Sequence, residues 1–414
     1  MSHAAHLNAA RSYRDAARAA AAQIDPAGQR AHHGFAWIAT SVAALEAVAA
    51  WADVGGGVNP ADALVQRLAF AETIAQLVGG LPMGQNELVR PADLGLGDAA
   101  NILAASCADL VGVDHAADRA GLAALLAHGH WPSETLHDAE LDAIRDQFRR
   151  FTEAEILPNA HGWHLANALI PDATVQAMAD LGTFGVCIPE EYGGLGLSKL
   201  VMCLVTEELS RGWIGAGSLG TRSEIAGELI AASGTPEQKA QWLPRIASGE
   251  VLPTAVFTEP DTGSDLGSLQ TRARREGKGW RIDGAKTWIT HAARSDLMTL
   301  LARTLPDASG YAGLSMLLVP KPRGNESDPF PAEGMSGSEI EVLGYRGMRE
   351  YALQFDGMAA PAEALLGGEQ GQGFKQLMRT FEGARIQTAA RAVGVARRAL
   401  ELGLDYATTR RQFG

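Results

Sequence analysis

Apolar residues recur at helical spacing through most of the first 130 positions of the chain. Positions three and four apart lie on one face of an α-helix, so such a run predicts an amphipathic helix. The clearest run comprises Ile38, Val42, Leu45, Val48 and Ala49. The region is rich in alanine, and its composition changes near residues 128–133. This pattern predicts an all-helical extension over residues 1–135.

In the rest of the chain, the spacing of apolar residues changes twice. Helical spacing with glycine-rich turns continues over residues 136–253, strand-like residues with turn signals fill residues 254–369, and helical spacing returns over residues 370–414. Helices, then strands, then helices predict an α+β fold with three regions behind the extension. The last region has room for one or two amphipathic helices. No period marks a repeat array.

Turn signals divide the strand-rich region near its beginning. The strand-type run at residues 255–257 enters a Pro/Asp/Gly cluster, and residues 277–279 (GKG) and 283–284 (DG) are two hairpin signals. Two hairpins would bring the ends of these strands together. We therefore expect Thr258 and Thr290 on neighbouring strands.

Charge and cysteine content narrow the class of protein. A formal net charge of -13 and a pI near 5.3, without a Lys/Arg stripe, argue against a nucleic-acid binder. Any pocket for an anionic ligand must then be locally basic. Cys107, Cys187 and Cys203 show no CxxC spacing, which predicts neither a metal site nor a disulfide framework and fits a reducing cytoplasm.

The N-terminus predicts no targeting or membrane segment. It lacks a basic stretch followed by an apolar run. No stretch reaches the roughly 18 consecutive apolar residues of a membrane span. We therefore expect a cytoplasmic protein without a signal peptide or a membrane helix.

Hydroxyl and aromatic side chains gather in two segments, residues 257–265 (FTEPDTGSD) and residues 283–290 (DGAKTWIT). An isoalloxazine ring needs hydrogen bonds along its polar edge and a flat apolar wall, which threonines, backbone N–H groups and a tryptophan supply. Taken one at a time, Thr and Trp are simply good strand residues. Taken together, the two segments indicate a flavin site.

These two segments resemble the acyl-CoA dehydrogenase family, whose flavin strand carries Thr-Glu-Pro-x-x-Gly-Ser-Asp followed by Gly-x-Lys-x-Trp-Ile-Thr. The resemblance spans about residues 140–414. It implies a helical domain, a middle β-barrel-like domain and the start of a C-terminal helical bundle. It also implies FAD as cofactor, an acyl-CoA substrate, an electron-transfer flavoprotein as acceptor and a homodimer or homotetramer. The further matching segments are residues 188–196, 207–211, 234–239 and 344–347.

The resemblance also assigns flavin contacts. Phe257 and Thr258 would meet the flavin through backbone and side chain, Trp288 would flank the ring, and Thr290 would bond near N5. Ser264 would contact either the flavin phosphate or the pantetheine of CoA.

Further contacts come from the C-terminal region. Arg385 would approach CoA, or would be an ordinary surface cation. Arg410, Gln412 and Phe413 resemble a segment that reaches the FAD diphosphate of a neighbouring subunit, where an Arg suits a bidentate phosphate contact.

The catalytic base departs from the family pattern. Family members use a Glu carboxylate to remove the α-proton while a hydride leaves the β-carbon for flavin N5. A minority place that Glu directly before the Arg that matches Arg385, where this chain has Ala384. We therefore expect the base to lie beyond Gly414. Glu382 is expected to pair with Arg385, whereas Glu350 would line the acyl pocket, contact a water or be structural.

The helical extension and Glu350 resemble a subgroup of the ethylmalonyl-CoA pathway that converts (2S)-methylsuccinyl-CoA to mesaconyl-CoA. Within the extension, residues 76–80 (QLVGG) are similar to a flavin-diphosphate run of the family, but we interpret them as a helix that ends at a glycine cap. A buried second carboxylate of the substrate needs a cation or several donors. The candidates near the acyl pocket are Arg222, His291, Arg346, Arg349 and Tyr351.

Three alternatives stay open. A short-chain or branched monocarboxylic acyl-CoA could be the substrate. An acyl-CoA oxidase would use the same motifs and differ in oxygen access. A chain that lacks most of its C-terminal bundle could also be an inactive scaffold, with apolar helix faces such as Val393 and Leu400 exposed.

Overall fold

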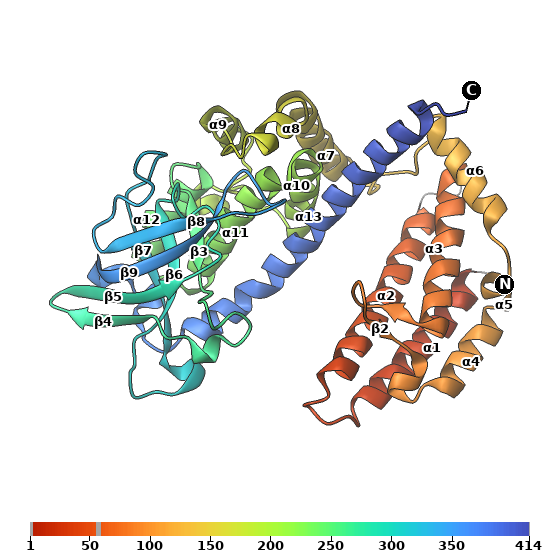
Figure 1. Cartoon of the computed structure of the whole chain (residues 1–414), viewed down its shortest axis with the longest axis horizontal. Coiled ribbons are helices and arrows are strands. Elements are labelled where there is room, and N and C mark those ends of the chain that lie inside the picture. The colour runs from red at the N-terminus through yellow and green to blue at the C-terminus, as the bar shows by residue number, and fades with distance from the viewer. Residues whose placement is uncertain (1–2, 55–58, 414) are drawn as a thin grey trace. The chain divides into compact units, whose positions relative to one another are not determined.

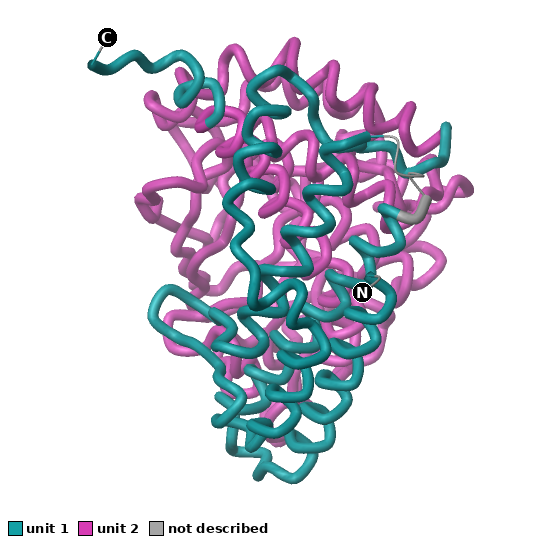
Figure 2. The backbone as a smooth tube through the Cα atoms, turned by 90° about the vertical axis from the view of Figure 1, so that its right-hand side faces the viewer, with its two compact units in different colours: residues 1–139, 404–414 teal, residues 140–403 magenta. Residues whose placement is uncertain are grey.

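The computed structural model describes residues 3–54 and 59–413. The chain forms two compact units. Unit 1 comprises residues 1–139 and 404–414, and unit 2 comprises residues 140–403 (Figures 1 and 2). Each unit has its own buried apolar residues.

Unit 1 is built mainly from helices, as its apolar spacing predicts. Ile38, Val42 and Leu45 are buried together in its core. Its helices are α1 (His3–Ala21), α2 (Gln29–Val54), α3 (Pro60–Gly79), α4 (Gly97–Ser106), α5 (Ala108–Val111) and α6 (Ala116–Ala127), and the short strands β1 (Leu81–Pro82) and β2 (Leu88–Val89) pair with each other. The N–H of Gly80 donates to the carbonyl of Gln76, so residues 76–80 are the capped end of α3.

One described helix bears on the expectation of no membrane span. The part of α2 from Gln29 to Ala52 has a mean hydropathy of 1.5 and is long and apolar enough to cross a membrane, by length and composition only. Of the apolar stretch of this helix that meets the criterion, 17% is buried within the structure. A helix near the N-terminus of a helical bundle can meet the same criterion, and α2 contributes Ile38, Val42 and Leu45 to the core of unit 1.

Unit 2 begins and ends with helices. The segment at residues 234–239 is a helix start, because Thr235 and Gln238 cap each other's backbone N–H groups. The helices are α7 (Ala139–Phe151), α8 (Leu157–Leu165), α9 (Asp172–Asp180), α10 (Lys199–Gly212), α11 (Ile214–Ser233), α12 (Pro236–Ala247) and α13 (Gly373–Thr409), with a π-helical turn (Thr152–Ile156) before α8. The first residue of α7 and the residues of α13 from Leu404 onward are counted in unit 1. The C-terminal region is thus one continuous helix, α13.

A mixed seven-stranded sheet lies between these helices in sequence and confirms the α+β prediction (Figure 1). Its order is β3-β6-β4-β5-β9-β8, and β7 also pairs with β6. The strands are β3 (Pro253–Val256), β4 (Arg272–Glu276), β5 (Gly279–Lys286), β6 (Leu297–Arg303), β7 (Leu314–Pro320), β8 (Met335–Ile340) and β9 (Glu350–Ala360). β3 and β6 are parallel, whereas β5 and β9 are antiparallel.

Two turn predictions have different outcomes. Residues 277–278 do connect β4 and β5 as a hairpin. Asp283 and Gly284, however, lie inside β5, where the register with β9 shifts at a bulge. The sequence signal was wrong there because a bulge also favours a glycine with positive φ.

Thr258 and Thr290 also differ from the prediction. Both lie in loops that follow strands, β3 and β5 respectively, and not on the strands themselves. The loops are nevertheless joined, because the N–H of Thr287 donates to the carbonyl of Thr258 at 3.0 Å. The predicted proximity therefore arises from loop-to-loop hydrogen bonding.

Candidate functional site

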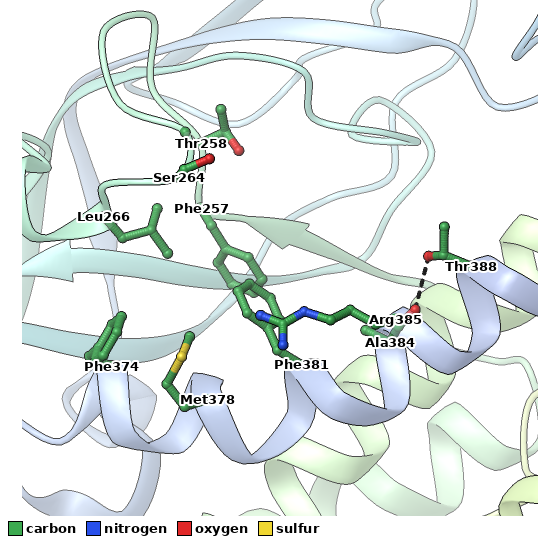
Figure 3. Close-up of a pocket in the computed structure, with 11 residues that line it drawn as sticks. Phe257, Thr258, Ser264, Leu266, Phe374, Met378, Phe381, Ala384, Arg385 and Thr388 are labelled. Atoms are coloured by element: carbon green, nitrogen blue, oxygen red, sulfur yellow. Dashed lines mark hydrogen bonds between the residues drawn. The ribbon is translucent and has the colours of Figure 1, made fainter. Parts of the chain in front are cut away.

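A cavity of about 470 Å³ opens between the loop that follows β3 and the first half of α13 (Figure 3). Ligand sites commonly have volumes of roughly 300–1,000 Å³. The cavity is lined by Phe257, Thr258, Gly263, Ser264, Leu266, Phe374, Met378, Phe381, Ala384, Arg385 and Thr388. The lining is mostly apolar and aromatic, and its one charged member, Arg385, is a cation, which suits an anionic ligand in an acidic protein.

The cavity unites three of the predicted flavin residues. Phe257, Thr258 and Ser264 come from one loop, and the ring of Phe257 lies edge-on to that of Phe381 with 6.1 Å between centroids. The side-chain oxygens of Thr258 and Ser264 make no hydrogen bond to any described residue. Free hydroxyls beside an aromatic wall are the donor set that a flavin or a pantetheine chain would use.

Arg385 lines the cavity from its α13 side. Its guanidinium carbon is 5.8 Å from the centroid of the Phe381 ring, a cation–π arrangement visible in Figure 3. The expected ion pair between Glu382 and Arg385 is not found among the described residues, where the Arg385 guanidinium faces the Phe381 ring instead. Ala384 lines the cavity and has no carboxylate.

Trp288 and Thr290 lie in the loop after β5. Trp288 is 56% exposed and has a φ of 57°, a backbone conformation that non-glycine residues rarely adopt. His291 and Arg349 also have positive φ, and the N–H of His291 donates to the carbonyl of Arg349. Strained backbone of this kind is often found at binding sites.

Thr290 forms a buried pair with Glu350, the first residue of β9. The Thr290 hydroxyl lies 2.7 Å from one carboxylate oxygen and 3.0 Å from the other. Burial raises the pKa of Glu350, and the Thr290 hydrogen bond and the charge of Arg222 offset part of that rise. The predicted N5 contact and the predicted pocket acid are thus in direct contact.

A cationic cluster lies close to this pair. We call Arg222, Arg391, Tyr345 and Ser218 the Arg222–Arg391 cluster. The Tyr345 oxygen accepts from Arg222 at 3.2 Å and from Arg391 at 2.8 Å, and it is also hydrogen-bonded to Ser218. Burial alone would raise the pKa of Tyr345, but the two guanidinium groups outweigh it and lower the pKa. Neither arginine forms an ion pair with a carboxylate among the described residues.

Three of the other four candidates for carboxylate recognition have surroundings that differ from those of Arg222. Arg346 donates to the carbonyls of His164 and Val342, and Arg349 donates to Asn167 and pairs with Glu339. The Tyr351 ring is buried edge-on against Phe330. Of the five candidates, Arg222 therefore has the environment that best suits a ligand carboxylate.

His291 is buried, and neither ring nitrogen has a hydrogen-bond partner in the described structure. Burial, reinforced by nearby cations such as Arg294, holds its pKa well below the usual histidine range. A neutral imidazole is a poor partner for a carboxylate, which makes His291 a weaker candidate than Arg222.

Sequence reasoning missed Tyr345, Arg391 and Ser218. Tyr345 stood within a matching segment, but nothing in its spacing linked it to residues on α11 and α13. Ser218 and Arg391 are 173 positions apart and meet only in the folded chain, at 2.8 Å. A basic residue two turns beyond Arg385 on the same predicted helix was the one available signal.

Arg410, Gln412 and Phe413 belong to unit 1 and are exposed. The Arg410 guanidinium donates to the Tyr406 hydroxyl at 2.8 Å, and the Gln412 amide donates to the Arg411 carbonyl. Their predicted contact with the FAD of a second subunit stays a prediction.

Replacing Glu350 with Gln should raise the stability of the protein at pH 7–8. A carboxyl group whose folded-state pKa is raised binds more protons in the folded than in the unfolded state, so stability falls as pH rises through that window. Glu350→Gln stays neutral and avoids this loss. The difference in thermal midpoint between the variant and the parent protein should therefore shrink as pH falls toward the ordinary glutamate range.

Glu237→Gln is the control of opposite sign. Hydrogen bonds from its own N–H and from Thr235 lower the pKa of Glu237 at the start of α12. Its contribution is present at neutral pH and lost on acidification, so this variant should be no more stable than the parent. A Glu350→Gln midpoint at or below that of the parent at pH 7–8 would contradict the prediction.

Three family models match the chain in succession. The model described as acyl-CoA dehydrogenase, N-terminal domain, matches residues 138–250. The middle-domain model matches residues 254–358, and the C-terminal-domain model matches residues 371–414.

Among curated relatives, (2S)-methylsuccinyl-CoA dehydrogenase of Cereibacter sphaeroides is 55% identical over 397 residues, covering 93% of this chain and 71% of the relative. Glutaryl-CoA dehydrogenase of Desulfococcus multivorans is 34% identical and covers 66% of this chain and 69% of the relative. Only the first of these two alignments is long enough to require residues of the N-terminal extension.

The solved structures that resemble this chain include members of the same family. A glutaryl-CoA dehydrogenase in complex with glutaryl-CoA has a TM-score of 0.62 and 31% identity, covering 68% of this chain and 70% of that one. A Mycobacterium smegmatis glutaryl-CoA dehydrogenase in complex with FADH2 has a TM-score of 0.59 and 29% identity, covering 67% of each chain.

Proposed function

We propose, from the premise that this chain belongs to the acyl-CoA dehydrogenase family, that it serves the FAD-dependent α,β-dehydrogenation of an acyl-CoA thioester with a second carboxylate. The substrate we propose is (2S)-methylsuccinyl-CoA and the product mesaconyl-CoA. Bound flavin would supply the acceptor for the β-hydrogen. The residues of this chain would bind and orient both molecules.

The cavity beside α13 would take part of the flavin or of the thioester chain. The free hydroxyls of Thr258 and Ser264 would donate to polar atoms of these ligands, and Phe257 would give an apolar wall. Trp288 is exposed enough to cover a planar ring. Thr290 would present its hydroxyl near the reactive edge of the flavin, and Arg385 would attract the anionic CoA moiety.

The Arg222–Arg391 cluster is the observation that carries the dicarboxylate proposal. Two guanidinium groups converge on the Tyr345 oxygen without a protein carboxylate between them. Both arginines are partly buried, and a ligand carboxylate could accept hydrogen bonds from both of them. Glu350 connects this cluster to the proposed flavin site, because Thr290 bonds to it and the charge of Arg222 acts on it.

Glu350 is better suited to lining the acyl pocket than to removing a proton. Both of its oxygens lie within hydrogen-bond reach of Thr290. The base would then be a carboxylate other than Glu350. We also propose an electron-transfer flavoprotein as electron acceptor, and a second copy of the chain whose FAD would meet Arg410, Gln412 and Phe413.

The similarity to (2S)-methylsuccinyl-CoA dehydrogenase supports this choice of substrate. That match extends over 93% of the chain, whereas the match to glutaryl-CoA dehydrogenase extends over 66%. A short monocarboxylic acyl-CoA is the second candidate, since short-chain specific acyl-CoA dehydrogenase of Homo sapiens is 34% identical over 67% of the chain.

Anaerobic titration of the FAD-reconstituted protein tests the proposal. (2S)-Methylsuccinyl-CoA should perturb the flavin absorbance, and butyryl-CoA should do so far less. Perturbation reports binding even where hydride transfer is slow. A response to butyryl-CoA alone would leave the family intact and overturn the dicarboxylate, whereas failure to bind FAD would overturn the flavin proposal itself.

A further inference from the structure

The ammonium group of Lys286 is buried at the end of β5, and its side chain has 0% exposure. Its Nζ donates to the carbonyls of Phe257 at 2.8 Å and Leu301 at 2.9 Å. It also lies 3.1 Å from a carboxylate oxygen of Glu259. An ammonium group has three protons, so all three have acceptors within the protein.

Glu259 is the other half of this buried pair. One of its oxygens accepts from the N–H of Thr271 at 2.8 Å, and the other accepts from the N–H of Gln270 at 2.7 Å. Its own N–H donates to the carbonyl of Thr262 at 2.8 Å, closing a tight turn. Glu259 therefore holds the turn from Glu259 to Thr262 against the segment that leads into β4.

Together the two side chains fix the loop that carries Thr258 and Ser264. Lys286 binds the carbonyl immediately before Thr258, the neighbouring Thr287 N–H binds the carbonyl of Thr258 itself, and Glu259 follows directly. Three consecutive residues, of which Phe257 and Thr258 line the cavity, are thus tied to the end of β5. The hydroxyl of Thr258 makes no hydrogen bond to any residue that the structure describes.

We propose that Lys286 and Glu259 are a positioning pair, which holds the backbone of residues 257–262 so that Thr258 and Ser264 face the flavin. Neither side chain lines the cavity, so the pair acts through the loop and not by contact with the ligand. The inference rests on the proposed flavin site. It adds two residues to which that proposal gives no role.

The energetics favour a geometric role over a contribution to stability. Burial lowers the pKa of Lys286 to about 8, and the attraction of Glu259 only partly offsets this loss. For Glu259, burial would raise the pKa, but the charge of Lys286 and the two N–H donors outweigh it and lower the pKa. Replacing a buried ion pair with apolar residues is often neutral for stability. What apolar side chains cannot replace is the fixed direction of these hydrogen bonds.

Lys286→Met tests the inference, with Lys321→Met as its matched control. Lys321 is also buried, its pKa is also lowered to about 8 by burial, and it also donates to backbone carbonyls, those of Ala293 and Pro322. Its ammonium group makes no hydrogen bond to residues 257–264 in the described structure. FAD affinity would be measured on apoprotein by quenching of flavin fluorescence, and visible circular dichroism would report the surroundings of the bound ring.

Lys286→Met should weaken FAD binding about tenfold or more, as expected when a charged donor is removed from buried acceptors. It should also alter the visible dichroism of the flavin that remains bound. Lys321→Met should leave both unchanged. If Lys286→Met does not fold, Lys286→Met/Glu259→Gln removes the unpaired buried charge and still lacks the donor to the Phe257 carbonyl, so its FAD affinity should fall equally.

Two results distinguish failure of this inference from failure of the proposed function. A parent protein that does not bind FAD overturns both. A parent protein that binds FAD, with Lys286 variants that match Lys321→Met in affinity and dichroism, leaves the flavin site standing and overturns the positioning pair. Equal loss of thermal stability in both lysine variants, without a flavin change specific to Lys286, would also overturn it.

Discussion

Arg222→Met should weaken the binding of (2S)-methylsuccinyl-CoA by about 100-fold or more while leaving butyryl-CoA nearly unaffected. Removing one partner of a buried charge pair costs roughly 2–5 kcal/mol, because the remaining charge stays unpaired. About 2.7 kcal/mol already corresponds to a hundredfold change. Butyryl-CoA has no second carboxylate, so the loss of the cation would leave no unpaired charge behind.

The dissociation constants of both thioesters can be measured from the flavin spectral perturbation, in the parent and in two variants. Arg346→Met is the matched control, because Arg346 belongs to the same segment as Tyr345 but donates to backbone carbonyls. Arg346→Met should change the dissociation constants of both thioesters by the same factor. An Arg222→Met protein with an unchanged ratio of the two constants would show that the Arg222–Arg391 cluster does not read the second carboxylate.

The flavin segments could be recognised from the sequence because their chemistry is local. Phe257, Thr258 and Ser264 lie within eight positions of one another, and a single loop carries all three into the cavity. Arg385 lines the same cavity because it lies on the first half of α13, which forms the opposite wall. A contiguous motif of this kind can be identified without knowing how the surrounding strands pair.

The Arg222–Arg391 cluster shows the opposite case. Arg222 was one candidate among five, and nothing local distinguished it. The distinction comes from Tyr345, which is 123 positions away, and from Arg391, which is a further 46 positions along the chain. Ion pairs separate the candidates too, since Arg349 is neutralised by Glu339 whereas Arg222 has no such partner among the described residues.

The ends of the strands could be predicted only where a turn signal is compatible with a single backbone structure. The glycines at 277 and 279 border a true hairpin between β4 and β5. Asp283-Gly284 has the same composition as a hairpin turn, yet β5 continues through it to Lys286. A glycine with positive φ serves a turn and a bulge equally well, so the pattern alone could not decide between them.

This bulge is the basis for the largest stability effect that we expect. Gly284 has a φ of 144°, and a Cβ built there would lie 2.7 Å from the Cα of Thr271. Gly284→Ala therefore combines an unfavourable backbone conformation with a clash against backbone atoms that cannot rotate away. Overpacking costs about 1–3 kcal/mol and the unfavourable conformation about 1–2 kcal/mol. We expect urea unfolding to show a loss of about 3 kcal/mol.

Gly277→Ala separates the two causes. Gly277 also has a positive φ, 57°, but a Cβ there would meet no atom within 4 Å, so only the conformational cost of about 1 kcal/mol remains. Equal losses of unfolding free energy in the two variants would mean that Thr271 moves aside at little cost. Thr271 is also the residue whose N–H Glu259 binds. If the bulge and the flavin loop are coupled as we infer, Gly284→Ala should weaken FAD binding as well, while Gly277→Ala should not.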